Sequence, residues 1–203
     1  MSVKESLADK GLNDKPFDLF LRVFKHEDVI EVWVKPQTAS KYVHLQDFPV
    51  CQKSGDLGPK RQQGDLQVPE GVYFVDRFNP NSSYHLSLGL NYPNKSDRIR
   101  GHQTRPGGDI FIHGECVTVG CLPITNPLIE ELYALAEIAK GHGNPIAVHI
   151  FPFRMKDEAP TGKYWEETTV DFWKELQPVY NYFEEKQELP TVGFDAKGAY
   201  IVK

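Results

Sequence analysis

Hydrophobic and polar positions alternate along much of the first half of the chain, in the pattern of half-buried β-strands. Residues 17–24 and 29–34 are rich in β-branched and aromatic side chains and flank a short polar stretch, which predicts a β-hairpin. In residues 83–90 the alternation places Tyr84 on an apolar face and His85 on a polar one. Further strands are expected at residues 42–50, 71–78, 109–113 and 145–153.

The period of the pattern changes in the second half, where apolar residues recur every three to four positions as in an amphipathic helix. We expect this helix to begin at Asn126 as the N-cap, with Pro127 at its first position, and to end at Gly141. Residues 164–186 also predict a helix, which Pro178 should kink or divide into two segments.

Two long polar loops interrupt the predicted strands, at residues 52–69 and 91–108. The length of the first loop predicts a functional rim rather than a simple connector. A short surface helix is expected at residues 2–10. Because strands dominate the first half and no linker or repeat divides the chain, we predict one mostly β fold with flanking α-helices, of the α+β class.

Composition and charge exclude several classes of protein. The 203 residues carry a formal net charge of −5 and no long run of Lys or Arg, which argues against nucleic acid as the main partner. No apolar stretch is long enough to cross a membrane, so no integral membrane segment is expected. The polar N-terminal residues lack the apolar core of a signal peptide, so we expect either a cytoplasmic protein or an exported one whose leader has been removed.

A candidate catalytic motif lies in the middle of the chain, where Ile112-His113-Gly114 precedes Thr118-Val119-Gly120-Cys121. Acyl transfer needs a thiol, a base that takes its proton, and a turn that exposes backbone N–H groups. Cys121 would be the nucleophile, with its pKa lowered by the following helix, and His113 the general base. The alternatives are a buried cysteine and a core histidine.

The glycines and the threonine of the motif have predicted roles as well. Gly114 allows close approach of its backbone, and Gly120 permits an unusual backbone angle and exposes N–H groups for an oxyanion. Thr118 would hydrogen-bond across the turn. His85 and Arg154 are candidate substrate ligands, Arg154 as a clamp for a carboxylate.

The three cysteines, Cys51, Cys116 and Cys121, are an odd number, so at least one thiol is free or pairs between chains. A scaffold of disulfides is excluded at this size. Cys116 is open to three interpretations: a zinc ligand with His113 and Cys121, a regulatory disulfide partner of Cys121, or a buried residue. The spacing matches no common structural zinc pattern, so zinc is the least favoured.

Together, Ile112-His113-Gly114 and Thr118-Val119-Gly120-Cys121 resemble the signature of the YkuD-type L,D-transpeptidases, especially the YafK-like branch. Residues 64–71, 84–94 and 148–154 are also similar to this branch. The resemblance covers about residues 17–154, which we expect to be the catalytic domain, preceded by an N-terminal segment at 1–16. Residues 155–203 are then expected to be a helical extension packed on the same domain.

This resemblance implies an L,D-transpeptidase-like fold of two mixed β-sheets, with Cys121 as nucleophile and His113 as base. It implies that the carbonyl of Gly114 orients the imidazole, and that no metal or cofactor takes part. The commoner family form has a histidine and an Arg or Asn where this chain has Val119 and Pro123, so the contacts those side chains make are not expected here.

The substrate implied by the resemblance is a peptidoglycan stem peptide, cross-linked to another stem or to a protein. The alternative is an amide hydrolase that releases a wall-linked lipoprotein or trims stem peptides. A second alternative is a non-catalytic envelope protein that binds wall peptides, and a third is a cytosolic thiol hydrolase. Because peptidoglycan lies outside the cytoplasmic membrane, we expect an exported protein of the periplasm or cell envelope.

Overall fold

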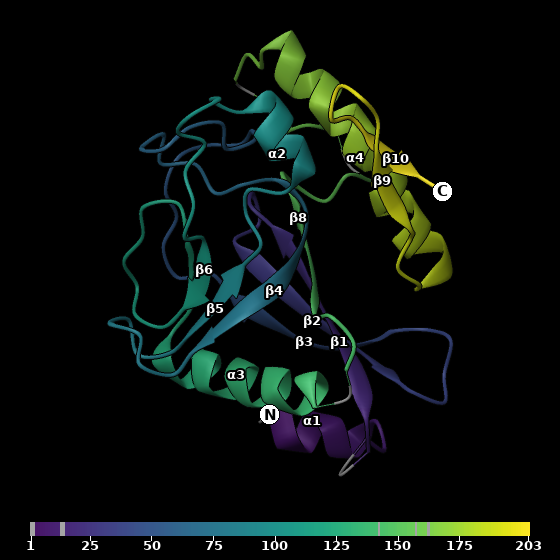
Figure 1. Cartoon of the computed structure of the whole chain (residues 1–203). Coiled ribbons are helices and arrows are strands. Elements are labelled where there is room, and N and C mark those ends of the chain that lie inside the picture. The colour runs from purple at the N-terminus through teal and green to yellow at the C-terminus, as the bar shows by residue number, and fades with distance from the viewer. Residues whose placement is uncertain (1–2, 13–14, 142, 157, 162) are drawn as a thin grey trace.

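The computed structural model describes residues 3–12, 15–141, 143–156, 158–161 and 163–203, and an eight-stranded mixed β-sheet runs through it (Figure 1). The strand order is β3-β2-β1-β8-β4-β5-β6-β7, and a separate two-stranded sheet pairs β10 with β9. The strands are β1 (Phe17–Phe24), β2 (Val29–Pro36), β3 (Val43–Pro49), β4 (Gly71–Asn79), β5 (Ser87–Leu90), β6 (Phe111–His113), β7 (Leu122–Pro123), β8 (Ala147–Phe151), β9 (Val192–Phe194) and β10 (Tyr200–Val202). The helices are α1 (Val3–Asp9), α2 (Lys95–Arg100), α3 (Asn126–Lys140) and α4 (Glu167–Lys186).

Strand β4 joins the two halves of the large sheet. Its first half, from Gly71 to Phe74, pairs with β8, and its second half, from Val75 to Asn79, pairs with β5 with a register shift between Val75 and Arg77. Each half contains one parallel pair, β1 with β8 and β6 with β7. The predicted mostly β fold with flanking helices is confirmed, and the two mixed sheets implied by the resemblance are continuous through β4.

Helices α3 and α4 cover opposite faces of the sheet, as the side chains of β1 demonstrate. All eight residues of β1 are buried. Leu21 and Val23 belong to the main hydrophobic core, which includes the buried face of α3. Phe20 and Phe24 instead contact Phe183 and Tyr180 of α4. Figure 1 shows α3 beside α1 at one side of the sheet and α4 beside β9 and β10 at the other.

The predicted strand at residues 83–90 is shorter in the structure, where β5 begins only at Ser87. All four residues of β5 are buried, so no polar face alternates with an apolar one. The backbone turns at His85, whose φ is +74°. Tyr84 therefore leaves the core that the alternation predicted for it, and 47% of its surface is exposed.

The loop predicted at residues 91–108 contains the short helix α2, which the sequence analysis missed. A capping box begins this helix: Asn94 Oδ1 accepts from the N–H of Asp97, and a carboxylate oxygen of Asp97 accepts from the N–H of Asn94. The predicted N-cap of α3 is also wrong by one residue. Thr125 is the N-cap, without a side-chain capping bond, and Asn126 is the first residue of the helix. The side chain of Asn126 accepts from the N–H of Glu115.

A helical extension was expected at residues 155–203, but this part of the chain contains strands as well as a helix. Helix α4 begins at Glu167 rather than at residue 164, and it continues through Pro178 as one helix. The hairpin of β9 and β10 follows it and packs on the same side of the sheet. None of the helices in the described residues combines the length and apolarity that a membrane span requires.

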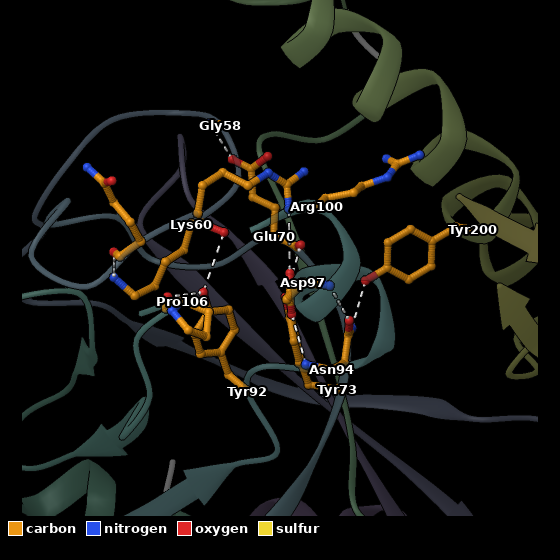
Figure 2. Close-up of polar contacts among 12 residues, drawn as sticks. Gly58, Lys60, Glu70, Tyr73, Tyr92, Asn94, Asp97, Arg100, Pro106 and Tyr200 are labelled. Carbon is orange, nitrogen blue, oxygen red and sulfur yellow. Dashed lines mark hydrogen bonds and ion pairs between the residues drawn. The ribbon is translucent and has the colours of Figure 1, made fainter. Parts of the chain in front are cut away.

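A buried polar network ties α2 to the sheet and to the C-terminal hairpin, and Figure 2 shows its members pointing toward one another. Tyr73 of β4 donates its hydroxyl hydrogen to Asp97, which is 1% exposed. The amide of Asn94 donates to the hydroxyl oxygen of Tyr200 on β10 at 2.8 Å. A neighbouring buried carboxylate, Glu70, accepts hydrogen bonds from the Lys25 ammonium, from the N–H of Gly58 in the 52–69 loop and from the indole N–H of Trp173 on α4. These contacts fix the loops that surround the site described below.

The Asp97 carboxyl predicts a specific pH dependence of stability. Burial raises its pKa to about 6, although hydrogen bonds from Asn94 and Tyr73 lower it. The protonated Asp97 carboxyl therefore adds about 3 kcal/mol to the free energy of unfolding. This contribution is fully present below about pH 4 and is lost as the pH rises through 6. Of this, about 2 kcal/mol should be lost between pH 4.5 and 7.

Urea unfolding of Asp97→Asn at these two pH values tests this assignment. The variant cannot ionise at this position, so its free energy of unfolding should fall by about 2 kcal/mol less than that of the wild type over this range. An equal fall in both proteins would contradict the raised pKa.

Candidate active site

The parallel pairing of β6 and β7 brings the candidate base and nucleophile together. Ile112 lies opposite Leu122 in this pair, and His113 lies opposite Pro123. His113 ends β6 and Cys121 directly precedes β7, so the two residues lie on neighbouring segments. Both line one open cavity with a volume of about 500 Å³. The structure thus places an imidazole and a thiol in a common cleft, eight residues apart in sequence.

The turn that presents Cys121 is held by two hydroxyl groups. The Thr118 hydroxyl accepts from the N–H of Cys121 at 2.9 Å and donates to the carbonyl of Cys121 at 2.8 Å. Ser54, from the 52–69 loop, accepts from the N–H of Gly120 at 2.7 Å. Gly120 has a φ of +98°, and a Cβ there would lie 3.0 Å from the carbonyl oxygen of Gln67. The position therefore requires glycine.

These hydrogen bonds change the expected role of the turn. Both N–H groups that the sequence analysis assigned to an oxyanion, those of Gly120 and Cys121, already donate to side-chain hydroxyls. Thr118 has the turn-stabilising contact that was expected of it. An oxyanion would have to displace Ser54 or Thr118 to use these donors, so their part in catalysis stays a prediction.

Cys121 borders two cavities. The residue is partly exposed and borders both the 500 Å³ cavity and a second cavity of about 280 Å³. The second cavity is lined by residues 52–57, so the long loop does form a rim beside the thiol. The thiol itself lies 3.5 Å from the carbonyl oxygen of Asp109. Cys121 is therefore neither a sealed core residue nor a fully solvated one.

The imidazole of His113 is fixed by its neighbour in the chain. Its Nδ1 lies 2.6 Å from the carbonyl oxygen of Gly114. Because a carbonyl oxygen can only accept, Nδ1 carries the hydrogen, and Nε2 of the neutral ring is left as the basic nitrogen. This is the contact that the family resemblance implies for Gly114.

Gly114 also permits a close approach of three other groups. A Cβ at this residue would lie 2.7 Å from Asn126 Oδ1, 2.9 Å from the carbonyl oxygen of Tyr84 and 3.0 Å from the Cβ of His85. Any larger residue would push the 82–86 turn or the start of α3 away from His113. The lack of a side chain is thus a requirement of packing around the base.

Burial shifts the pKa values of the two groups in opposite directions. It raises the pKa of the Cys121 thiol more than the backbone hydrogen bond from Phe111 and the charge of Lys60 lower it. It lowers the pKa of the His113 imidazole more than the hydrogen bond to Gly114 and the charge of Glu115 raise it. The pair therefore rests as neutral thiol and neutral imidazole. The expectation that the following helix lowers the thiol pKa is wrong, because burial dominates.

Alkylation of the thiol by iodoacetamide tests this resting state, since the thiolate is the reactive form. We expect the rate at Cys121 to rise with pH and to reach half its maximum above about pH 8.5, the ordinary pKa of a cysteine. Cys51 and Cys116 are joined in a disulfide and do not react. A half-maximum near neutral pH would show a preformed thiolate and imidazolium instead.

The structure pairs Cys51 with Cys116, which corrects the earlier interpretations of Cys116. Their Cα atoms are 5.6 Å apart, and Cys121 keeps a free thiol. A disulfide between Cys116 and Cys121 and a zinc site at these cysteines are both contradicted, because the sulfur of Cys116 is already bonded. Within the described residues, no group of three or more His, Cys, Asp or Glu is arranged to hold a metal ion.

The two candidate substrate ligands are engaged elsewhere. His85 Nε2 lies 2.6 Å from a carboxylate oxygen of Glu130 on α3. Arg154 forms an ion pair with Glu31 on β2. Neither residue is among those that line the two cavities at Cys121. A role for either in binding substrate stays a prediction and would require these pairs to open.

Sequence reasoning missed three features of the site. The Ser54 hydroxyl lies 66 residues before Gly120, to whose N–H it is bonded, and Cys51 lies 65 residues before its disulfide partner Cys116. Tyr84 lines the larger cavity although its sequence pattern suggested the core. Only the long loop at residues 52–69 gave a signal, through its length. Val119, which replaces the histidine of the commoner family form, is 71% exposed at the rim.

Comparisons with known proteins agree on one family. The model of the YkuD family, the L,D-transpeptidase catalytic domain, matches residues 30–170. Over 187 residues the chain is 37% identical to the Escherichia coli (strain K12) protein named "Putative L,D-transpeptidase YafK", covering 91% of this chain and 73% of that protein.

Among solved structures, the helical cell shape determining protein Pgp2 of Campylobacter jejuni has a similar fold. Its TM-score is 0.55 at 17% sequence identity, and the match covers 96% of this chain and 80% of that chain. A K307A mutant of the same protein gives the same TM-score of 0.55 at 19% identity, over 90% of this chain and 63% of that chain. At these identities the likeness concerns the fold alone.

Proposed function

The chain belongs to the YkuD family of L,D-transpeptidase catalytic domains, and from this membership we propose that it is a cysteine acyltransferase acting on peptidoglycan stem peptides. The observation that carries the proposal is the shared cavity of Cys121 and His113, with the imidazole held by Gly114. The thiol is free and partly exposed, as a nucleophile must be. We propose that the protein acts in the periplasm or cell envelope, where peptidoglycan lies.

Acylation begins with both groups neutral. As Cys121 Sγ attacks the carbonyl carbon of the third, diamino acid residue of the stem, His113 Nε2 takes the thiol proton. The tetrahedral intermediate then collapses, the C–N bond breaks, and His113 gives the proton to the departing amine. The product is a thioester between the stem peptide and Cys121, with the imidazole neutral again.

The second step depends on the acceptor. An amine that loses its proton to His113 Nε2 attacks the thioester carbon, the C–S bond breaks, and the proton returns to the sulfur. The 280 Å³ cavity is also lined by Cys121, and we place the acceptor there, apart from the cavity shared with His113. This separate cavity supports transfer to another stem peptide or to a protein.

Hydrolysis is the alternative outcome of the same chemistry, with water as the acceptor. The chain would then trim stem peptides or release a wall-linked lipoprotein, and the YafK-like branch is associated with both outcomes. The open, partly polar rim of the site admits water as well as an amine. A further alternative is a protein that binds wall peptides without catalysis, which an unreactive Cys121 would favour.

Incubation with purified peptidoglycan fragments separates these functions. We expect mass spectrometry of the products to show cross-linked or amine-coupled stem peptides, with loss of the residue after the diamino acid. Shortened stem peptides that end in a free carboxylate, with no amine coupled to them, would show that the protein is a hydrolase. Unchanged fragments, from several stem peptides and with an added lipoprotein-linked sample, would contradict any enzymatic function.

A further inference from the structure

Tyr84 lies against His113 at the edge of the active site. The two ring centroids are 4.8 Å apart, and the ring planes are inclined at 37°. Tyr84 lines the 500 Å³ cavity together with His113 and Cys121, and it remains 47% exposed. A large aromatic side chain that stays this exposed is not there to fill the core. Its ring instead covers part of the imidazole.

Two contacts and a neighbouring glycine define the turn that carries Tyr84. The N–H of Tyr84 donates to the hydroxyl of Ser82 at 3.1 Å. The next residue, His85, has a φ of +74° and pairs with Glu130 on α3 at 2.6 Å. Gly114 has no side chain to keep the turn away from His113. The position of the Tyr84 ring is therefore built into the fold rather than left to a free surface side chain.

We propose that Tyr84 is a positioning residue for His113 in acyl transfer, an inference that rests on the proposed function. One hydrogen bond, from Nδ1 to the carbonyl of Gly114, leaves the imidazole free to tilt about that bond. The tilted Tyr84 ring lies against the imidazole and would restrict this freedom, holding Nε2 in place beside the cavity that His113 shares with Cys121. Such fixing of a base within a few tenths of an ångström strongly affects proton transfer.

The contact depends on the ring rather than on the hydroxyl. The Tyr84 hydroxyl has no hydrogen-bond partner among the residues that the structure describes, so it does not hold the ring in place. Phenylalanine should therefore replace tyrosine without loss, and alanine should not. This difference distinguishes a positioning role from hydrogen bonding to substrate.

Tyr84 also shields the imidazole from water, which gives a second, independent readout. Among the neighbouring charged groups, the Glu115 carboxylate raises the pKa of His113. The other titratable groups nearby are Asp109 and Cys121, which line the same cavity, and the His85–Glu130 pair beside the turn. Burial lowers the pKa of His113, so removal of the covering ring should raise this pKa toward its ordinary value.

Two measurements on Tyr84→Ala and Tyr84→Phe test the proposal. Single-turnover acylation by a stem peptide should be about tenfold slower at saturation in Tyr84→Ala, with its half-saturating concentration unchanged. NMR titration of the His113 ring, assigned with His113→Gln, should give a higher pKa in Tyr84→Ala than in the wild type. Tyr84→Phe should match the wild type in both. Phe74→Ala, which removes another exposed aromatic ring from β4, is the matched control and should change neither.

A wild-type rate and imidazole pKa in Tyr84→Ala would overturn the proposal. So would a loss in Tyr84→Phe as large as in Tyr84→Ala, because the hydroxyl would then be the active group. A rise in half-saturating concentration at an unchanged maximal rate would make Tyr84 a substrate contact instead. If the wild type forms no acyl-enzyme, the proposed function fails, while the titration of His113 still decides whether Tyr84 covers the ring.

Discussion

Replacing Cys121 with alanine is expected to abolish acyl transfer, lowering the rate by about 10⁴-fold or more while the fold is retained. The sulfur is the atom that forms the thioester, and no other free thiol can replace it, because Cys51 and Cys116 are joined to each other. The side chain is partly exposed, so its loss should change the free energy of unfolding by only about 1 kcal/mol. The conversion of peptidoglycan fragments and urea unfolding measure the two effects separately.

The double variant Cys51→Ala with Cys116→Ala is the matched control for this experiment. It loses two sulfur atoms and the disulfide but keeps Cys121, so it should still form the thioester. A folded Cys121→Ala protein that retains the wild-type rate would exclude Cys121 as the nucleophile. Complete loss of activity in the folded double variant would contradict the claim that Cys121 is the only sulfur on which the reaction depends.

Replacing His113 with glutamine is expected to lower the acylation rate at pH 7 by about 10²–10⁴-fold. The thiol rests protonated, because burial raises its pKa, and without Nε2 no group is placed to take the proton. The wild-type rate should level off once the imidazole is neutral, at a pH below the ordinary histidine pKa of about 6.5. The rate of His113→Gln should keep rising with pH until the thiol itself ionises.

The shape of the pH profile is the decisive part of this prediction. A merely structural histidine would lower the rate equally at every pH, so parallel profiles for His113→Gln and the wild type would contradict its role as base. His44→Gln is a suitable control, because His44 is an exposed histidine that pairs with Asp47 on β3, away from the cavity. That variant should keep the wild-type profile.

Local patterns were sufficient to predict the parts of the fold whose contacts are close in sequence. The hairpin of β1 and β2 follows from its β-branched and aromatic residues, the helix α3 follows from its three-to-four spacing, and both are present. The capping box of α2 was also readable, because Asn94 and Asp97 stand at the required spacing. Strands β9 and β10, of three residues each, are too short to show a period.

The alternation around Tyr84 shows why such patterns fail near a site. Leu88 and Leu90 are buried as expected, yet Ser87 and Gly89 on the other face are buried too. The chain turns at His85, and the ring of His85 pairs with Glu130 of α3. That pairing joins residues forty-five positions apart, and no local pattern contains it.

The candidate site divides in the same way. Cys121 and His113 were recognisable because both belong to one short motif. Ser54 and Cys51 reach that motif only after the long loop folds over it. The direction of the thiol pKa shift also depends on burial, which is a property of the whole fold. Reasoning from the nearby helix alone gave the opposite direction.

The central claim is that the sulfur of Cys121 becomes acylated by a stem peptide, and the mass of the intact protein measures this directly. After rapid mixing with a tetrapeptide-containing peptidoglycan fragment and quenching in acid, we expect a mass increase equal to the mass of the fragment minus that of the released fourth amino acid. Proteolysis should localise the adduct to the peptide that contains Cys121. No mass increase at any time point, or an adduct on a different residue, would contradict the account.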